Sequence, residues 1–95
     1  MEERKLVFRV HAIRRMFERG ISTNEVREAV ETGEVIENYP DDEPYPSRLI
    51  LGRSGSRPLH VVAAENGGER TTVIITVYEP DPSMWEPDFR HGRKR

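Results

Sequence analysis

A small set of polar side chains in this sequence could carry out acid-base catalysis on a phosphate ester. Such catalysis needs one group to take a proton from the attacking hydroxyl, a second to protonate the leaving oxygen, and donors to hold the phosphate. Histidine serves both proton transfers because its ordinary pKa lies near neutrality. We therefore expect His11 and His60 to act as acid and base, with Tyr78 donating a hydrogen bond to a phosphate oxygen.

Arg15, Arg19 and Thr76 are the side chains that we expect to bind the substrate. Arg15 and Arg19 follow His11 at intervals of four residues, so these three share one face of a helix. Thr76 lies two residues before Tyr78, on the same face of a strand. The pattern permits a cleft with the helix on one side and strands on the other.

Each of these residues also fits a purely structural role. His11 can hydrogen-bond within the first turn of its helix, and His60 can pack in the sheet with one nitrogen satisfied. Exposed arginines on helices commonly pair with carboxylates such as Glu18. Tyr78 ends a strand, where a tyrosine usually packs its ring in the core and leaves its hydroxyl at the edge of the core. Thr76 lies on the same strand face and has the same structural alternative.

Metal sites are disfavoured by the spacing of the available ligands. The acidic run 41–43 lacks the glycine and the ligand spacing of a calcium loop. His11, His60 and His91 include no close pair, and the chain has no cysteine, so a zinc site is not expected. We expect neither a metal nor a cofactor.

Two short helices are predicted before residue 34. The first covers residues 11–19 and stops at Gly20, and the second follows a capping box formed by Ser22 and Glu25 and stops at Gly33. Because two residues separate them, they form a tight hairpin, with Ile21 tucked beneath the turn. The expected core-facing side chains of the first helix are Ala12, Ile13, Met16 and Phe17.

The strands are predicted after the helices. The segment 71–78 is β-branched or aromatic on both faces, which indicates a central strand. Its expected companions are the segments 34–39, 47–52 and 59–64. The segment 5–10 fits either a short strand or the lead into the first helix. This order of elements predicts an α+β fold in which the helices cover a small sheet.

Length and composition indicate one globular domain. A chain of 95 residues has one modest core, which we place in residues 1–89, with Trp85 and Phe89 folding the end back onto the body and residues 90–95 forming a basic tail. The net charge of −2 disfavours tight nonspecific binding to nucleic acid. Without cysteine or an apolar run of about 20 residues, we expect a soluble cytoplasmic protein that does not contact a membrane.

Several segments together resemble the bacterial domain-of-unknown-function family 4258: residues 11–22, 31–40, 44–52, 59–64 and 75–85. More distantly, that family resembles compact toxins of the RelE and ParE type. The resemblance implies an N-terminal helical hairpin packed on a curved four-stranded antiparallel sheet. It also implies metal-independent endoribonuclease activity and an antitoxin protein as a partner. Many such toxins are strongly basic, whereas this chain is slightly acidic.

Two functions therefore compete. The first is a small toxin-like endoribonuclease or RNA-interacting protein that uses the residues named above. The second is a non-catalytic module that binds a protein or a nucleic acid through the same helix face and the basic tail.

Overall fold

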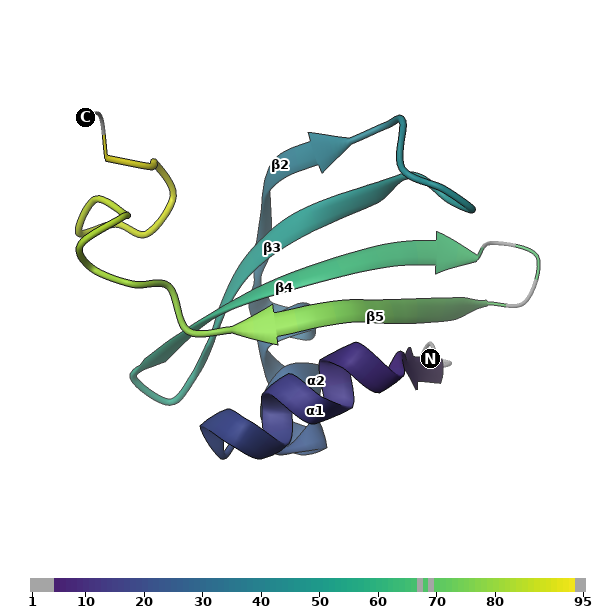
Figure 1. Cartoon of the computed structure of the whole chain (residues 1–95), viewed down its shortest axis with the longest axis horizontal. Helices are drawn as coiled ribbons and strands as arrows, with labels where there is room; N and C mark the ends of the chain where they lie inside the picture. The colour runs from purple at the N-terminus through teal and green to yellow at the C-terminus, as the bar shows by residue number, and fades with distance from the viewer. Residues whose placement is uncertain (1–4, 67, 69, 94–95) are drawn as a thin grey trace.

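Two helices and five strands make up the fold (Figure 1). The computed structural model describes residues 5–66, 68 and 70–93. Along the chain the elements are β1 (Lys5–Phe8), α1 (Val10–Arg19), α2 (Thr23–Thr32), β2 (Glu34–Tyr39), β3 (Ser47–Ser54), β4 (Arg57–Asn66) and β5 (Thr71–Tyr78). The fold class is therefore α+β, as the sequence predicts.

The strands form one mixed sheet in the order β1-β5-β4-β3-β2. The antiparallel part from β2 to β5 agrees with the prediction, and β5 has a neighbour on each side. The prediction of four strands is wrong, because Lys5–Phe8 forms a fifth strand parallel to β5. This pairing joins segments more than sixty residues apart, which local sequence patterns do not reveal.

The helical hairpin forms for the local reasons that the sequence indicates. Gly20 ends α1 in the left-handed conformation with φ of 65°, which a glycine adopts without a steric penalty. Ser22 caps α2: its Oγ accepts from the Glu25 amide at 3.1 Å, and a Glu25 carboxylate oxygen accepts from the Ser22 amide at 2.9 Å. Ile21 is buried between the two helices.

Both helices pack on one face of the sheet. Side chains from α1, α2 and the inner strands share a single core cluster: Ala12, Met16, Ile21, Val26, Ala29, Ile50, Leu59, Val61, Ala63, Ile74 and Val77. The predicted core face of α1 is partly wrong, since Ile13 is 53% exposed and Phe17 is 88% exposed. Helix α1 lies along β5 near the edge of the sheet, so only the narrow strip of Ala12 and Met16 is buried.

Candidate functional site

An open cleft of about 510 Å³ lies between α1 and the end of β5. It exists because β1 pairs with β5 only as far as Ile74, so the rest of that strand edge has no neighbouring strand among the described residues. The lining side chains come from one face of α1, from the end of β5 and from the segment after it: His11, Arg15, Arg19, Thr76, Tyr78, Glu79, Asp81, Met84 and Trp85. The cleft thus brings together every predicted site residue except His60.

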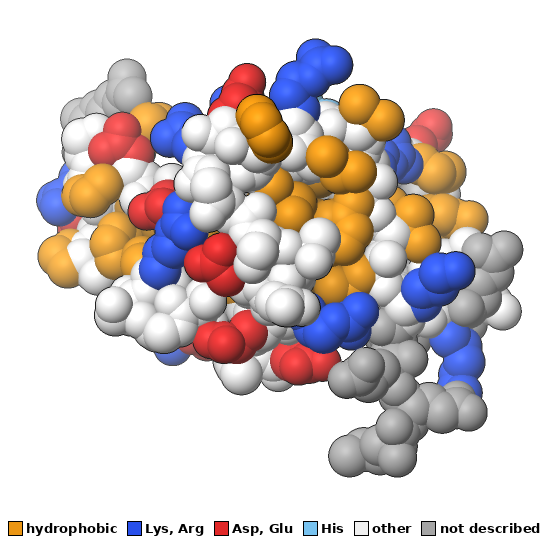
Figure 2. Space-filling model, turned by 90° about the horizontal axis from the view of Figure 1, so that it is seen from below, with side chains coloured by type: hydrophobic (Ala, Val, Ile, Leu, Met, Phe, Trp, Pro, Cys, Tyr) orange, Lys and Arg blue, Asp and Glu red, His pale blue; other side chains and the backbone are white. Residues whose placement is uncertain are grey.

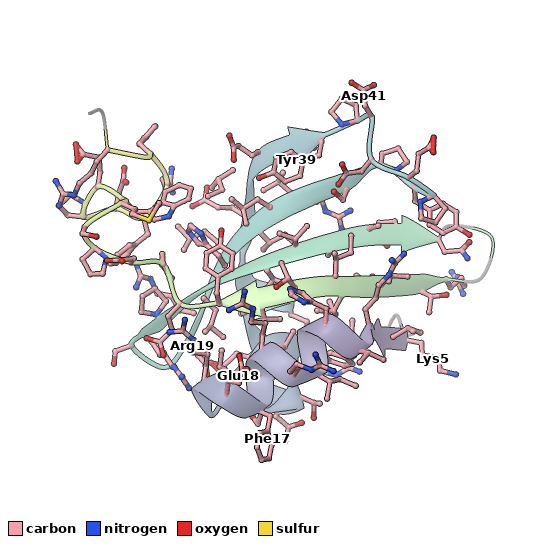
Figure 3. The ribbon with its side chains drawn as sticks, viewed as in Figure 1. Lys5, Phe17, Glu18, Arg19, Tyr39 and Asp41 are labelled. Atoms are coloured by element: carbon pink, nitrogen blue, oxygen red, sulfur yellow. The ribbon has the colours of Figure 1, made fainter. Side chains whose placement is uncertain are left out.

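The basic wall of the cleft is one face of α1. His11, Arg15 and Arg19 are each four residues apart, so their side chains point in similar directions along the helix. Figure 3 shows Arg19 at the end of α1 that lies below the end of β5. All three side chains are exposed, and a negatively charged ligand in the cleft can reach them.

The second wall of the cleft carries two hydroxyl groups on β5. Thr76 pairs with Val62 and Tyr78 pairs with His60 across the β4–β5 ladder, so both side chains lie on the sheet face away from the helices and line the cleft at the edge of β5. Burial raises the pKa of Tyr78, and the nearby Glu37 charge raises it further. Tyr78 is therefore a neutral hydrogen-bond donor at physiological pH.

His60 lies directly behind this wall and is fully buried. Its Nε2 is 2.8 Å from the carbonyl oxygen of Phe89, and because a carbonyl only accepts, Nε2 carries the proton. Its Nδ1 then accepts from the Tyr78 hydroxyl at 3.2 Å. The Trp85 ring meets the imidazole edge-on, with centroids 4.4 Å apart. Both ring nitrogens of His60 therefore have hydrogen-bond partners, and the contacts of this side chain support the wall of the cleft. The acid-base role of His60 stays a prediction.

The buried position of His60 makes stability depend on pH. Burial lowers the pKa of His60 below its ordinary value of 6.5, although the Phe89 carbonyl and the Glu37 charge oppose the shift. As the pH falls below 6.5, the unfolded chain binds a proton that the folded chain does not, so stability falls by at most about 1.4 kcal/mol per pH unit. Urea denaturation between pH 7.5 and 5 measures this loss, and His60→Gln is expected to remove that part of the slope.

Arg57 fixes the end of the cleft, a role that sequence analysis missed. Its guanidinium donates to Glu79 at 2.6 Å, to Glu25 at 3.1 Å, and to the backbone carbonyl oxygens of Arg19 and Gly20 at 2.8 and 3.2 Å. These bonds connect the turn between the helices to the end of β5. The sequence places Arg57 at a turn, and nothing in that segment signals such a role.

Two carboxylates in the cleft limit its positive charge. Glu79 shares the guanidinium of Arg57 with Glu25, so its charge is only partly compensated. Asp81 accepts hydrogen bonds from Ser83, which lower the pKa of Asp81 and keep it charged. Attraction of an anion therefore depends on the local positions of Arg15 and Arg19 and not on the net charge of the cleft.

The segment after β5 returns to the sheet and closes the end of the cleft. Phe89 is held through its carbonyl by His60, and Arg90 forms an ion pair with Glu34 of β2. Arg93 donates to the carbonyl oxygen of Pro82 at 2.8 Å. Residues 94–95 of the predicted basic tail lie outside the described residues.

No group of three or more histidine, aspartate or glutamate side chains in the described part of the chain is arranged to hold a metal ion. In the acidic run 41–43, Asp42 accepts a hydrogen bond from the Ser47 hydroxyl. Neither α1 nor α2 is long and apolar enough to cross a membrane.

Comparison with known protein families gives a match over most of the chain. Residues 8–79 match the family described as a domain of unknown function, DUF4258, which confirms the family resemblance seen in the sequence. Neither the curated proteins nor the solved structures contain a match to the chain. The more distant resemblance to RelE and ParE toxins has no support in these comparisons.

Proposed function

Since the chain belongs to the DUF4258 family, a domain of unknown function, we propose from its cleft that it is an RNA-interacting protein. The observation that carries the proposal is that His11, Arg15 and Arg19 line the same cleft as Trp85. Single-stranded RNA is bound by cations that track its phosphates and by aromatic rings on which its bases stack. Arg15 and Arg19 supply the first kind of contact, and Trp85 supplies the second.

Metal-independent cleavage is the activity that we propose for this cleft. His11 is exposed at the cleft and takes the proton of the 2'-hydroxyl. Arg15 and Arg19 stabilise the charge that grows on the phosphate oxygens, and Thr76 donates to one of them. Tyr78 donates to His60 in the free protein, and in the proposed complex its hydroxyl turns from His60 to a phosphate oxygen. Water in the open cleft protonates the leaving 5'-oxygen.

In this proposal the protein is a RelE/ParE-like toxin that acts in the cytoplasm and is neutralised by an antitoxin protein. The helical hairpin on one face of the antiparallel strands supports the likeness, whereas the parallel β1 is an addition to the expected sheet. The slightly acidic composition indicates that RNA is held by this local cleft and not by a generally basic surface.

The second candidate is a non-catalytic RNA-binding module. The observation that favours it is that both nitrogens of His60 are bonded, which leaves His11 as the one imidazole lining the cleft. Binding of the phosphates needs only the arginines and the aromatic ring, so it does not depend on a second proton-transfer group.

Fluorescence anisotropy with labelled single-stranded RNA in excess chelator tests the proposal. The double substitution Arg15→Ala/Arg19→Ala is expected to weaken RNA binding at least about tenfold. It is also expected to reduce the dependence of the RNA affinity on salt concentration by the equivalent of about two phosphate contacts. Arg53→Ala is the matched control, since Arg53 is an exposed arginine outside the cleft. Equal losses in both variants, or no binding by the unaltered protein, would refute the RNA-binding proposal.

Gel analysis of the same RNA separates the two candidates. If the unaltered protein cleaves the RNA in chelator, and His11→Ala binds the RNA without cleaving it, the protein is the proposed enzyme. Binding without cleavage identifies the non-catalytic module. Cleavage that persists in His11→Ala would remove His11 from the mechanism.

A further inference from the structure

Asp81 is a carboxylate that the proposed function leaves unexplained. It lines the cleft together with arginines of α1, yet it repels the phosphates that those arginines attract. Glu79, the other carboxylate of the cleft, has a structural role because it binds Arg57. The described part of the chain places no arginine, lysine or histidine in an ion pair with Asp81, and hydrogen bonds from Ser83 lower its pKa and keep it charged.

The turn after β5 contains both Asp81 and Trp85. The carbonyl oxygen of Asp81 accepts from the backbone N–H of Met84 at 2.9 Å and from that of Trp85 at 3.1 Å. The carboxylate oxygen Oδ1 of Asp81 accepts from the backbone N–H of Ser83 at 2.8 Å. A carboxylate has about four lone-pair sites, so this exposed side chain can accept further donors. A ligand that reaches Trp85 therefore meets the Asp81 carboxylate in the same cleft.

The Trp85 ring is positioned before any ligand arrives. The imidazole of His60 meets it edge-on with ring centroids 4.4 Å apart, and the ring is still partly exposed in the cleft. Aromatic rings stack all four bases, because every base has a π face. Trp85 can thus hold a base but cannot distinguish one base from another. Discrimination needs a polar group beside the ring, and Asp81 is such a group.

Acidic side chains alone are common on the surface of this protein. Figure 2 shows the helical side of the molecule, where acidic side chains lie among basic ones. Two features distinguish Asp81 from a solvated surface carboxylate. It shares a turn and a cleft with an aromatic ring, and it forms no ion pair with a cation of the described residues.

We infer that Asp81 and Trp85 form a subsite for an RNA base that carries an exocyclic amino group, so that cytosine is bound in preference to uracil. This inference rests on the proposed RNA binding. The amino group of cytosine at C4 donates to a carboxylate, which is how aspartate and glutamate recognise this base. Uracil has the same size but carries a carbonyl oxygen at C4, and a carboxylate repels that oxygen. Asp81 therefore gives up some attraction for phosphates and provides base selectivity.

Fluorescence anisotropy with labelled 2'-fluoro oligomers of cytidine or uridine tests this inference. The 2'-fluoro group replaces the attacking hydroxyl, so the oligomers are bound without being cleaved. The unaltered protein is expected to bind the cytidine oligomer at least about fivefold more tightly than the uridine oligomer. Pyrimidin-2-one is cytosine without its amino group, and an oligomer of this base is expected to lose the advantage of cytidine.

Asp81→Asn tests the carboxylate directly. The variant keeps one oxygen to accept from Ser83 and replaces the other oxygen with an N–H donor. It is expected to bind the uridine oligomer more tightly and to reduce the preference for cytidine to less than about twofold. Loss of a negative charge alone would raise both affinities and leave their ratio unchanged. Because Asp81 is exposed, circular dichroism and urea denaturation of the variant are expected to match those of the unaltered protein.

Asp41→Asn is the matched control. Asp41 is an exposed aspartate in the loop after β2, far from Arg19 and outside the cleft (Figure 3). Its substitution is expected to leave the ratio of the two affinities unchanged. Equal affinities of the unaltered protein for cytidine and uridine oligomers, or an unchanged ratio in Asp81→Asn, would overturn the inference and leave the RNA-binding proposal in place. Failure of the unaltered protein to bind any oligomer would overturn both.

Discussion

His60→Ala is expected to lower the free energy of unfolding by about 3 kcal/mol and to loosen the segment that follows β5. His60 is fully buried, so its removal leaves a cavity. The Phe89 carbonyl loses its donor at 2.8 Å, and the Tyr78 hydroxyl loses its acceptor at 3.2 Å. The Trp85 ring loses the edge contact that holds it against the sheet.

Urea denaturation measures the loss of stability, and tryptophan fluorescence reports the loosened segment, because Trp85 is the single tryptophan of the chain. His91→Ala is the matched control, because His91 is exposed and its side chain bonds to Asp88. This substitution is expected to change stability by less than about 0.5 kcal/mol. Unchanged Trp85 fluorescence in His60→Ala would show that this imidazole does not hold the segment in place.

The same substitution separates a supporting role from a catalytic one. His60 touches two residues of the cleft wall, Tyr78 and Trp85, but does not line the cleft itself. Its loss is therefore expected to weaken RNA binding together with stability. A direct role in proton transfer would instead lower the cleavage rate at saturating RNA with the affinity unchanged.

The elements that sequence analysis predicts well are those whose cause is local. The capping box of Ser22 and Glu25 starts α2 through bonds between residues three apart. Gly20 ends α1 through its own backbone conformation. The β-branched segment Thr71–Tyr78 forms an inner strand because its side chains are apolar on both faces. Each of these signals is contained within a few residues.

The features that sequence analysis misses depend on contacts between distant segments. The sequence leaves open whether residues 5–10 form a strand or the lead into α1, and Lys5–Phe8 becomes a strand because β5 offers it a parallel neighbour. Ile13 and Phe17 have the spacing of core residues, but α1 lies at the edge of the sheet, where few partners cover it. Arg57 joins three segments through its guanidinium, and its position at the start of β4 gives no sign of this.

Helical spacing places His11, Arg15 and Arg19 on one face of α1, but it indicates neither that this face meets β5 nor where His60 lies. A histidine between apolar residues of a strand fits both a site residue and a buried one. His60 is buried because the segment after β5 covers its face of β4, and that segment has no regular secondary structure. Sequence periodicity carries no information about it.

Gly52→Ala is expected to destabilise the protein by about 3 kcal/mol, because α2 lies directly on β3 at this residue. A Cβ at position 52 would lie 2.0 Å from the carbonyl oxygen of Ala29 and 2.6 Å from its Cα. Both atoms belong to the backbone of α2, so no change of side-chain rotamer relieves the overlap. The whole helix must move away from the sheet.

Gly55→Ala provides the contrast in a urea denaturation experiment. Gly55 has φ of 62° and nothing within 4 Å of the added methyl group, so its substitution costs about 1 kcal/mol through backbone conformation alone. Equal losses for the two variants would show that α2 does not pack closely on β3. Because Glu25 of α2 holds Arg57, and Arg57 holds Glu79, displacement of α2 by Gly52→Ala is also expected to disturb the cleft and weaken RNA binding.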